Sequence, residues 1–235
     1  MKLTTFLKSF SPYPVQAPFA EKLRSGLAGG LAIFMLAWGL HFLAQPPVTL
    51  LLLGSMAASA VLLYAVPHSP FAQPWNLVGG HLSSAICGGL SMAYIGDPFL
   101  AAGVAVGSAI FLMYLLNCLH PPGAATALTL VLGASQFQLI GLPGTASIVV
   151  ANTLIMLILA LIINNAIPRR YYPHMQAPTA PPPPSAAVVI TPEHADLEWA
   201  LAQSGNALNI SVEDLSEIYG LAQQRAQTRY DSAIT

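Results

Sequence analysis

The sequence predicts an all-α fold: a polytopic bundle of membrane-crossing helices. Of the 235 residues, 55% are hydrophobic and only 7% are charged, whereas soluble globular proteins carry about a quarter charged residues. Asp97 is the only Asp, Glu, Lys or Arg between Ser25 and Pro168. Several apolar stretches in this block reach the roughly 20 residues that a helix needs to span a bilayer. A chain of this composition cannot cover a water-facing surface, so we place residues 25–168 in lipid.

Turn signals separate the predicted crossings. The apolar stretches run over about 25–45, 48–66, 77–95, 99–119 and 145–167. Breaks such as Pro46-Pro47 and Gly96-Asp97-Pro98 lie between them, where proline removes a backbone donor. A further helix is expected from about Pro121 to Ala134, and its length of roughly 20 Å is short for a span.

Basic residues flank the membrane block at both ends. Lys8, Lys22 and Arg24 precede the first crossing, and Arg169 and Arg170 follow the last. Basic residues near membrane ends stay in the cytoplasm, so both termini are expected there. The number of crossings is then even, and we predict six crossings of the plasma (inner) membrane, counting the short helix.

The two halves of the membrane block share a pattern. The string GxxxGxAIF starts at Gly26 and again at Gly103, and a proline pair follows each copy. Ala57-Ala58-Ser59-Ala60 likewise matches Ala124-Ala125-Thr126-Ala127. Three crossings per half would give the 3+3 inverted repeat common among transporters. Chance is the alternative explanation, because segments rich in alanine and glycine match easily.

Four segments are expected along the chain. They are a cytoplasmic N-terminal segment at 1–24, the transmembrane domain at 25–168, a proline-rich linker at 169–190 and a cytoplasmic helical hairpin at 191–235. The prolines make the linker extended and semi-rigid. The hairpin has too few apolar positions for a core of its own. We therefore expect it to dock on the membrane domain or on another subunit.

The most distinctive string is His120-Pro121-Pro122-Gly123, which leads to Thr126. Two prolines fit the first turn of a helix, where missing amide protons cost nothing. If that helix begins inside the protein, its free amides and positive dipole end attract an anion. The alternative is that the prolines turn a corner at the headgroups and the small residues serve helix packing.

Further polar residues would line a neutral path through the membrane. The candidates besides the helix start are His81, Ser55, Ser59 and Asn117. An ionisable group at membrane depth marks a functional site by default, and imidazole changes charge near neutral pH. Alternatively, the hydroxyls form packing hydrogen bonds between helices and the histidines are interfacial anchors or satisfied packing residues.

These strings resemble the HPP family of integral membrane proteins, which is named after the His-Pro-Pro motif seen here at 120–122. The similarity extends to Gly54-Ser55, Ser69-Pro70 and Gly79-Gly80-His81, in the expected order, and covers most of 25–168. The resemblance implies transport, with nitrite as the substrate assigned to relatives from plant chloroplasts and cyanobacteria.

We expect transport of a small solute, a small inorganic anion such as nitrite, by a channel-like or facilitated route. Cation carriers generally use Asp or Glu within the span, whereas Asp97 lies in a Gly-Asp-Pro turn. The alternative is a structural or signalling module acting through the C-terminal hairpin. No enzymatic activity is expected, because the G-x-S-x-G, H-E-x-x-H and Cys-x-x-Cys motifs are missing.

The composition also limits the partners. A net charge of −1 without a basic stripe argues against nucleic acid. The expected partners are the lipid bilayer, a small anion and further copies of the chain, joined through the two GxxxG faces. Cys87 and Cys118 fall in membrane segments and offer neither a disulfide framework nor metal spacing. We expect no metal and no cofactor.

Overall fold

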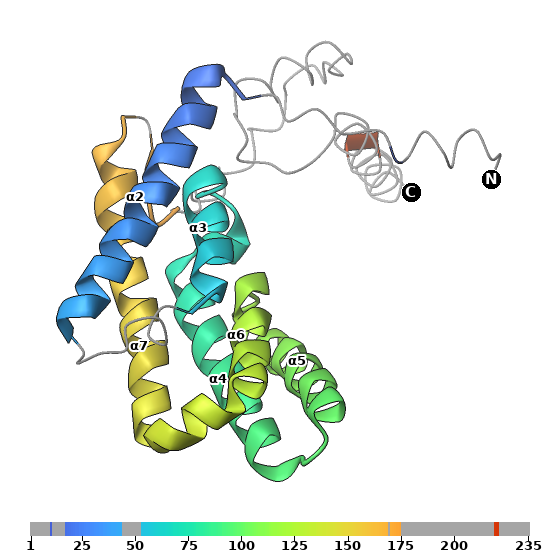
Figure 1. The fold of residues 1–235 in the computed structure, drawn as a ribbon. Helices are drawn as coiled ribbons and strands as arrows, with labels where there is room; N and C mark the ends of the chain where they lie inside the picture. The colour runs from blue at the N-terminus through green and yellow to red at the C-terminus, as the bar shows by residue number, and fades with distance from the viewer. Residues whose placement is uncertain (1–9, 11–16, 44–52, 169, 175–218, 221–235) are drawn as a thin grey trace, which may run out of the picture.

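The computed structural model describes residues 10, 17–43, 53–168, 170–174 and 219–220, and every regular element in this part is helical (Figure 1). The elements are α2 (Phe19–Leu43), α3 (Ser55–Ala65), the 3-10 turn η2 (Pro70–Ala72), α4 (Pro74–Tyr94), α5 (Pro98–Leu115), α6 (Pro121–Leu132) and α7 (Ala134–Ala166). This confirms the all-α prediction. The predicted linker and hairpin, 169–190 and 191–235, lie almost wholly outside the described residues.

Three of the described helices, α2, α5 and α7, are long and apolar enough to cross a membrane. Helix α4 has 21 residues but is rich in glycine and serine. Helices α3 and α6 are apolar but have only 11 and 12 residues, which corresponds to about 17 and 18 Å of length. The chain is therefore a polytopic helical membrane protein, and the exact number of crossings stays a prediction.

The second predicted span, 48–66, is wrong in its extent. Helix α3 begins only at Ser55: Gly54 is its N-cap residue, Leu53 has no regular structure, and residues 48–52 lie outside the described part of the chain. The amide of Leu53 donates instead to Oδ1 of Asn152 on α7, at 3.1 Å. A side chain from a distant helix thus satisfies this backbone group where the helix has not yet begun.

Two other helix boundaries also differ from the prediction. Helix α7 as a whole starts at Ala134 and breaks at Gly141, whose φ of 68° is in the left-handed region. The part after this break corresponds to the predicted last span at about 145–167, and the part before it adds a helical segment that was not predicted. Helix α5 ends at Leu115 rather than near residue 119. Asn117, with φ 51°, follows in the turn. Asparagine is one of the few residues besides glycine that adopt this conformation readily.

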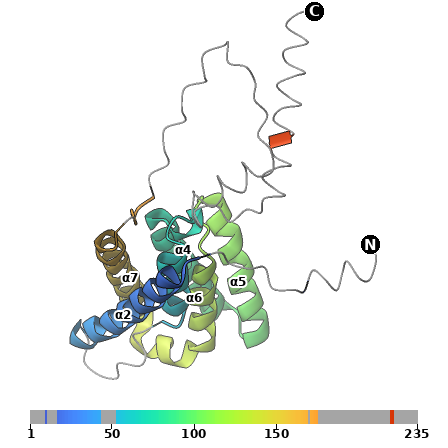
Figure 2. The ribbon, with the colours of Figure 1, turned by 90° about the horizontal axis from the view of Figure 1, so that it is seen from above.

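The helices pack in two groups of three. Helix α2 contacts α3 and α7, and α5 contacts α6 and α4. Helix α3 contacts α7, and α6 contacts α4, while the short helices α3 and α6 contact each other. If α2 corresponds to α5, α3 to α6 and α4 to α7, each of these contacts has a counterpart in the other half of the chain. Figure 2, which looks down on the bundle, shows α2 beside α7 and α5 on the other side of α4.

Arg170 joins the two ends of the helical domain. Its side chain, which is 5% exposed, donates to Glu21 Oε1, to Ser25 Oγ at 2.8 Å and to Asn164 Oδ1 at 3.2 Å. The start of α2 and the end of α7 therefore lie at the same end of the bundle. Which side of the membrane this end faces stays a prediction.

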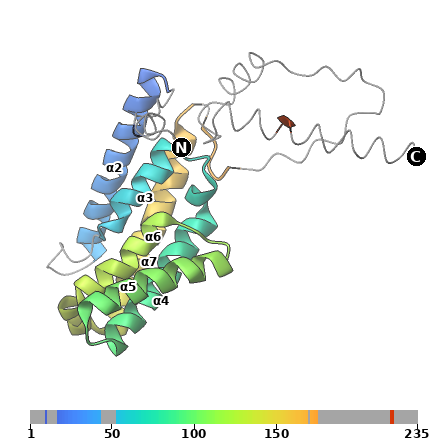
Figure 3. The same ribbon diagram turned by 90° about the vertical axis from the view of Figure 1, so that its right-hand side faces the viewer.

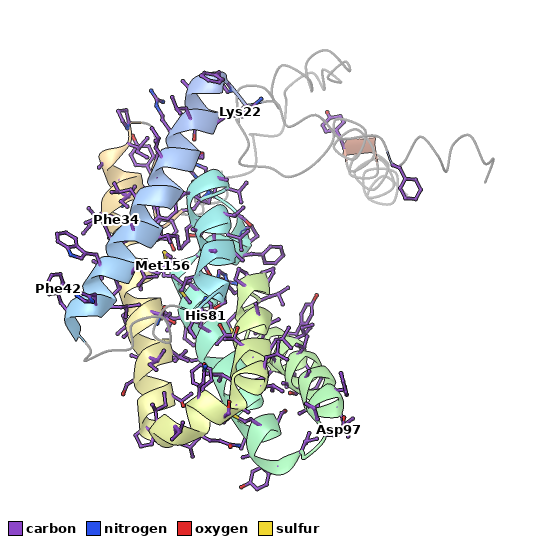
Figure 4. The ribbon with its side chains drawn as sticks, viewed as in Figure 1. Lys22, Phe34, Phe42, His81, Asp97 and Met156 are labelled. Carbon is purple, nitrogen blue, oxygen red and sulfur yellow. The ribbon has the colours of Figure 1, made fainter. Side chains whose placement is uncertain are left out.

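The outer faces of the helices are apolar, as contact with lipid requires. On α2, Phe34 and Trp38 are 61% and 55% exposed, and Figure 4 shows Phe34 projecting from the helix. The GxxxG glycines Gly26, Gly30, Gly103 and Gly107 are open as well, because a Cβ built on any of them meets nothing within 4 Å. These glycines do not mediate helix packing within the described chain, and their role in an oligomer stays a prediction.

Candidate functional site

Two buried histidines lie side by side in the interior of the bundle. His81 on α4 and His120, the N-cap residue of α6, have ring centroids 5.0 Å apart and are both 0% exposed. Figure 4 places His81 between Lys22 near one end of the bundle and Asp97 near the other. Gly80 permits this approach, because a Cβ there would lie 2.5 Å from Cβ of His120.

Ser59 on α3 bridges the two rings. Its Oγ lies 3.0 Å from Nε2 of His81 and 2.9 Å from Nε2 of His120. The other nitrogen of each ring is also used: Nδ1 of His81 lies 2.7 Å from Thr126 Oγ1, and Nδ1 of His120 lies 2.8 Å from the Phe71 carbonyl. Ser59 and Thr126 are 0% exposed. One hydrogen-bonded chain therefore connects α3, α4, α6 and η2.

The Phe71 carbonyl sets the direction of this chain when both rings are neutral. A carbonyl only accepts, so His120 carries its proton on Nδ1 and its Nε2 accepts from the Ser59 hydroxyl. Ser59 then accepts from Nε2 of His81, and Nδ1 of His81 accepts from Thr126. The last link is 2.8 Å between Thr126 Oγ1 and Ser55 Oγ. In order of donation, the chain runs Ser55, Thr126, His81, Ser59, His120 and the Phe71 carbonyl.

The short helices α3 and α6 meet at this cluster through their N-terminal halves. Ser55 pairs with Thr126, whereas the later residue Ser59 pairs with the earlier residue His120, so the two helices run antiparallel here. Figures 1 and 3 show α3 toward one end of the bundle and α6 toward the other. The N-terminal ends of both helices, where the dipole is positive, therefore lie beside the same buried polar side chains.

Close backbone contact holds α6 against α4. A Cβ on Gly123 would lie 2.7 Å from the Gly80 carbonyl oxygen, and one on Gly88 would lie 2.7 Å from the Ala127 carbonyl oxygen. Gly123 of the predicted motif thus has a packing role that only glycine can fill. Pro121 and Pro122 form the first turn of α6, with Pro122 buried and Pro121 exposed.

An asparagine holds the chain just before each short helix. Asn76 on α4 donates to the Leu119 carbonyl at 2.9 Å, and Asn152 on α7 accepts from the Leu53 amide. Both interactions anchor non-helical backbone next to the cluster. The sequence shows these residues only as polar groups within apolar stretches, because their partners are backbone atoms of distant segments.

Most of the predicted site residues converge. His81, His120, Ser55, Ser59 and Thr126 form the hydrogen-bonded chain, and Pro122 and Gly123 position its α6 end. Asn117 does not join them: it is exposed and lies in the turn after α5. No sequence pattern points to the Phe71 carbonyl, because every residue type has a backbone carbonyl. Among the described residues no group of three or more His, Cys, Asp or Glu could hold a metal ion.

A family comparison covers the whole helical domain, including the His-Pro-Pro string. Residues 14–173 match the transmembrane region of the HPP family. The chain belongs to the HPP family. His120, Pro121 and Pro122 are the motif of its name, and in this HPP protein they form the N-cap and first turn of α6.

Two transmembrane proteins of Dictyostelium discoideum are similar to this HPP protein. One is 44% identical over 130 residues, which cover 52% of this chain and 44% of the relative. The other is 40% identical over 168 residues, which cover 68% of this chain and 52% of the relative. The chain thus spans about half the length of these curated relatives. No solved structure matches it.

Proposed function

We propose that this HPP protein transports a small inorganic anion across the membrane, with nitrite as the first candidate. The observation that carries the proposal is the meeting of the α3 and α6 N-terminal halves at a buried polar cluster. Each helix N-terminus is equivalent to roughly half a positive charge. Between residues 25 and 168 the only fixed charge is Asp97, which instead caps α5 at the Leu100 amide. The cluster therefore favours an anion over a cation.

The short helices also support a transport role. Each is about half as long as the roughly 30 Å that a crossing requires. Helices that end within the membrane, with N-terminal ends aimed at anionic groups, are a feature of transporters built from inverted repeats. The contact pattern of α2–α4 and α5–α7 is the one that such a repeat would produce. We include the 3+3 repeat, with both termini cytoplasmic, in the proposal.

The cluster is closed in this structure, since its side chains satisfy one another. A passing anion would replace the hydrogen bonds that Ser59 and Thr126 now make within the protein. Hydroxyl donors in a low-dielectric site bind a small anion in place of its hydration shell. Opening therefore requires α3 and α6 to separate at Ser55–Thr126 and Ser59–His120, two side-chain hydrogen bonds that link the two segments.

The test is flux into proteoliposomes that contain the purified protein. Nitrite is compared with nitrate, formate, chloride and sodium, using wild type, His120→Ala and the control His68→Ala, whose ring lies outside the cluster. We expect selective anion flux that is lost in His120→Ala and kept in the control. A folded wild-type protein that carries none of these anions contradicts the proposal.

A further inference from the structure

We infer that the His81–Ser59–His120 cluster binds one proton together with one monovalent anion, so that transport is electroneutral and follows the pH gradient. The inference rests on the proposed function, because it specifies what the same site carries. It starts from the two hydrogen-bond patterns that the geometry allows. The neutral pattern, which runs from Ser55 to the Phe71 carbonyl, is described above.

A second complete pattern exists with one extra proton. If Nε2 of His120 is protonated, it donates to Ser59, and the Ser59 hydroxyl donates to Nε2 of His81. His81 then carries its proton on Nδ1 and donates to Thr126, which donates to Ser55. The same atom pairs form the hydrogen bonds, but donor and acceptor are exchanged in each of them except the bond from His120 to the Phe71 carbonyl. A protonated His81 is satisfied equally well, so the Ser59 hydroxyl shares the proton between the rings.

The hydrogen-bonded chain also defines where the proton enters. The Phe71 carbonyl cannot pass a proton on, so this end is closed. The proton enters at the other end before α3 and α6 separate, while the hydrogen-bonded chain is intact. Ser55, which is 2% exposed, takes a proton from hydronium and hands its own to Thr126, and the shift continues until Nε2 of His120 has gained one. One proton enters, and no bond other than O–H and N–H bonds is made or broken.

The cluster holds one proton and not two. The ring centroids are 5.0 Å apart, so two charged rings would repel each other at short range in the buried site, although the Ser59 hydroxyl could then donate to the Ser55 carbonyl at 3.2 Å. No carboxylate lies nearby to offset the charge, since α6 and α7 contain no titratable residue. The titratable residues of the other adjoining segments are Tyr64 on α3, His68 before η2 and Tyr172 against it, Cys87 and Tyr94 on α4, Asp97 and Tyr114 at the start and end of α5, and Cys118 after α5.

Burial then links the proton to the anion. A lone buried charge is costly, whereas a paired one is tolerated. His81 and His120 are 0% exposed, and Asp97 is the only fixed charge between residues 25 and 168. The positive ends of the two helix dipoles offset an anion only in part, and a proton on the histidine pair offsets the rest. A proton alone would add to the positive dipole ends, so the site takes up its proton together with an anion. The substrate class that fits is a monovalent anion.

The first experiment separates the two driving forces in proteoliposomes. Nitrite uptake is measured under an imposed pH gradient at zero membrane potential, and under a potassium diffusion potential at equal pH, with protein-free liposomes subtracting passive entry of the acid. We expect uptake to rise about tenfold for each unit by which the outside pH is lowered. It should not change with the membrane potential. Uptake that follows the potential and ignores the pH gradient overturns the inference and leaves anion transport intact.

Matched variants assign the effect to the cluster. Thr126→Val keeps the side-chain shape without the hydroxyl and should lose most of the response to the pH gradient. Thr126→Ser, which keeps the hydroxyl, should retain more of it, and the control His68→Gln, outside the cluster, should respond like wild type. Equal responses of the valine and serine variants contradict a role for the hydroxyl chain.

Nitrogen NMR of histidine-labelled protein tests proton binding without any transport assay. At neutral pH we expect His120 protonated on Nδ1 and His81 on Nε2, and on acidification in the presence of nitrite the pair should take up one proton. Two protons, or none down to pH 4, overturns the inference. If the NMR titration shows one proton but the protein carries no anion in the flux assay, the proton site is confirmed. Both the proposed function and the coupling are then contradicted.

Discussion

A Cβ added to Gly80 would lie 2.5 Å from the Cβ of His120, closer than two side chains can approach. Both histidines of the cluster depend on this contact, because it lets α4 lie against the start of α6. Gly80→Ala should therefore force the two segments apart. Overpacking of this kind costs about 1–3 kcal/mol or more, which a lowered thermal midpoint in detergent would show.

Gly89→Ala is the matched control for this change. Gly89 lies on the same helix, but a Cβ there meets nothing within 4 Å. Alanine is favoured over glycine in helices by about 1 kcal/mol, so this variant should be as stable as wild type or slightly more stable. Equal losses in both variants would mean that the Gly80–His120 contact is not what limits stability.

Arg170 is predicted to hold the two ends of the domain together. Arg170→Ala removes donors to Glu21, Ser25 and Asn164, and breaking a largely buried ionic network costs on the order of 3 kcal/mol. The control is Arg24→Ala, because Arg24 meets Glu21 only at 4.0 Å and its side chain is 53% exposed, a pair worth about 0–1 kcal/mol. The unfolding midpoint should fall below that of wild type for Arg170→Ala and stay near it for Arg24→Ala. Similar midpoints for both variants would contradict the role of Arg170 in holding the two ends together.

The segment after α7 should set how far the chain can be shortened. The Tyr172 hydroxyl donates to the Ala72 carbonyl at 2.7 Å, and the His174 amide donates to Gln73 Oε1 at 2.9 Å, so residues 170–174 hold the loop before α4. A chain ending at His174 should fold and transport anions. A chain ending at Pro168 should lose stability, measured by size-exclusion profile and thermal midpoint. Loss of transport in both would favour the alternative role of the C-terminal hairpin.

The His68–His174 contact should weaken in acid. Their Nδ1 atoms lie 3.2 Å apart, so at least one ring must be neutral to accept. Burial, together with neighbouring His174 and Arg170, lowers the pKa of His68, and Glu21 opposes this in part. The unfolded chain then binds more protons, so stability from this site is complete above the ordinary histidine pKa of about 6.5 and falls as the pH drops below it.

His68→Gln serves to measure this effect. The variant has no titrating group at residue 68, so its unfolding midpoint should fall less than that of wild type between pH 7.5 and pH 5. His41→Gln, altered at the exposed end of α2, should keep the wild-type dependence. Parallel curves for wild type and His68→Gln would show that this histidine does not titrate with folding.

Properties that depend on local sequence could be predicted well. Hydropathy predicted the helical membrane domain, and proline in the first turn placed the start of α6 at Pro121, because proline restricts its own backbone wherever it occurs. Helix extents were less predictable. The sequence at Leu53 is compatible with a helix and with a buried loop, and the hydrogen bond from the Leu53 amide to Asn152 distinguishes them.

The sequence by itself therefore determined that this is an all-α HPP membrane protein with a helix beginning at His-Pro-Pro, since composition and proline act through nearest neighbours. Only the tertiary structure decided that Ser59, His81 and His120 meet, that Asn117 stays apart and that Gly80 must lack a side chain. These relationships join residues on different helices, and their distances follow from how the helices pack, which no local pattern encodes.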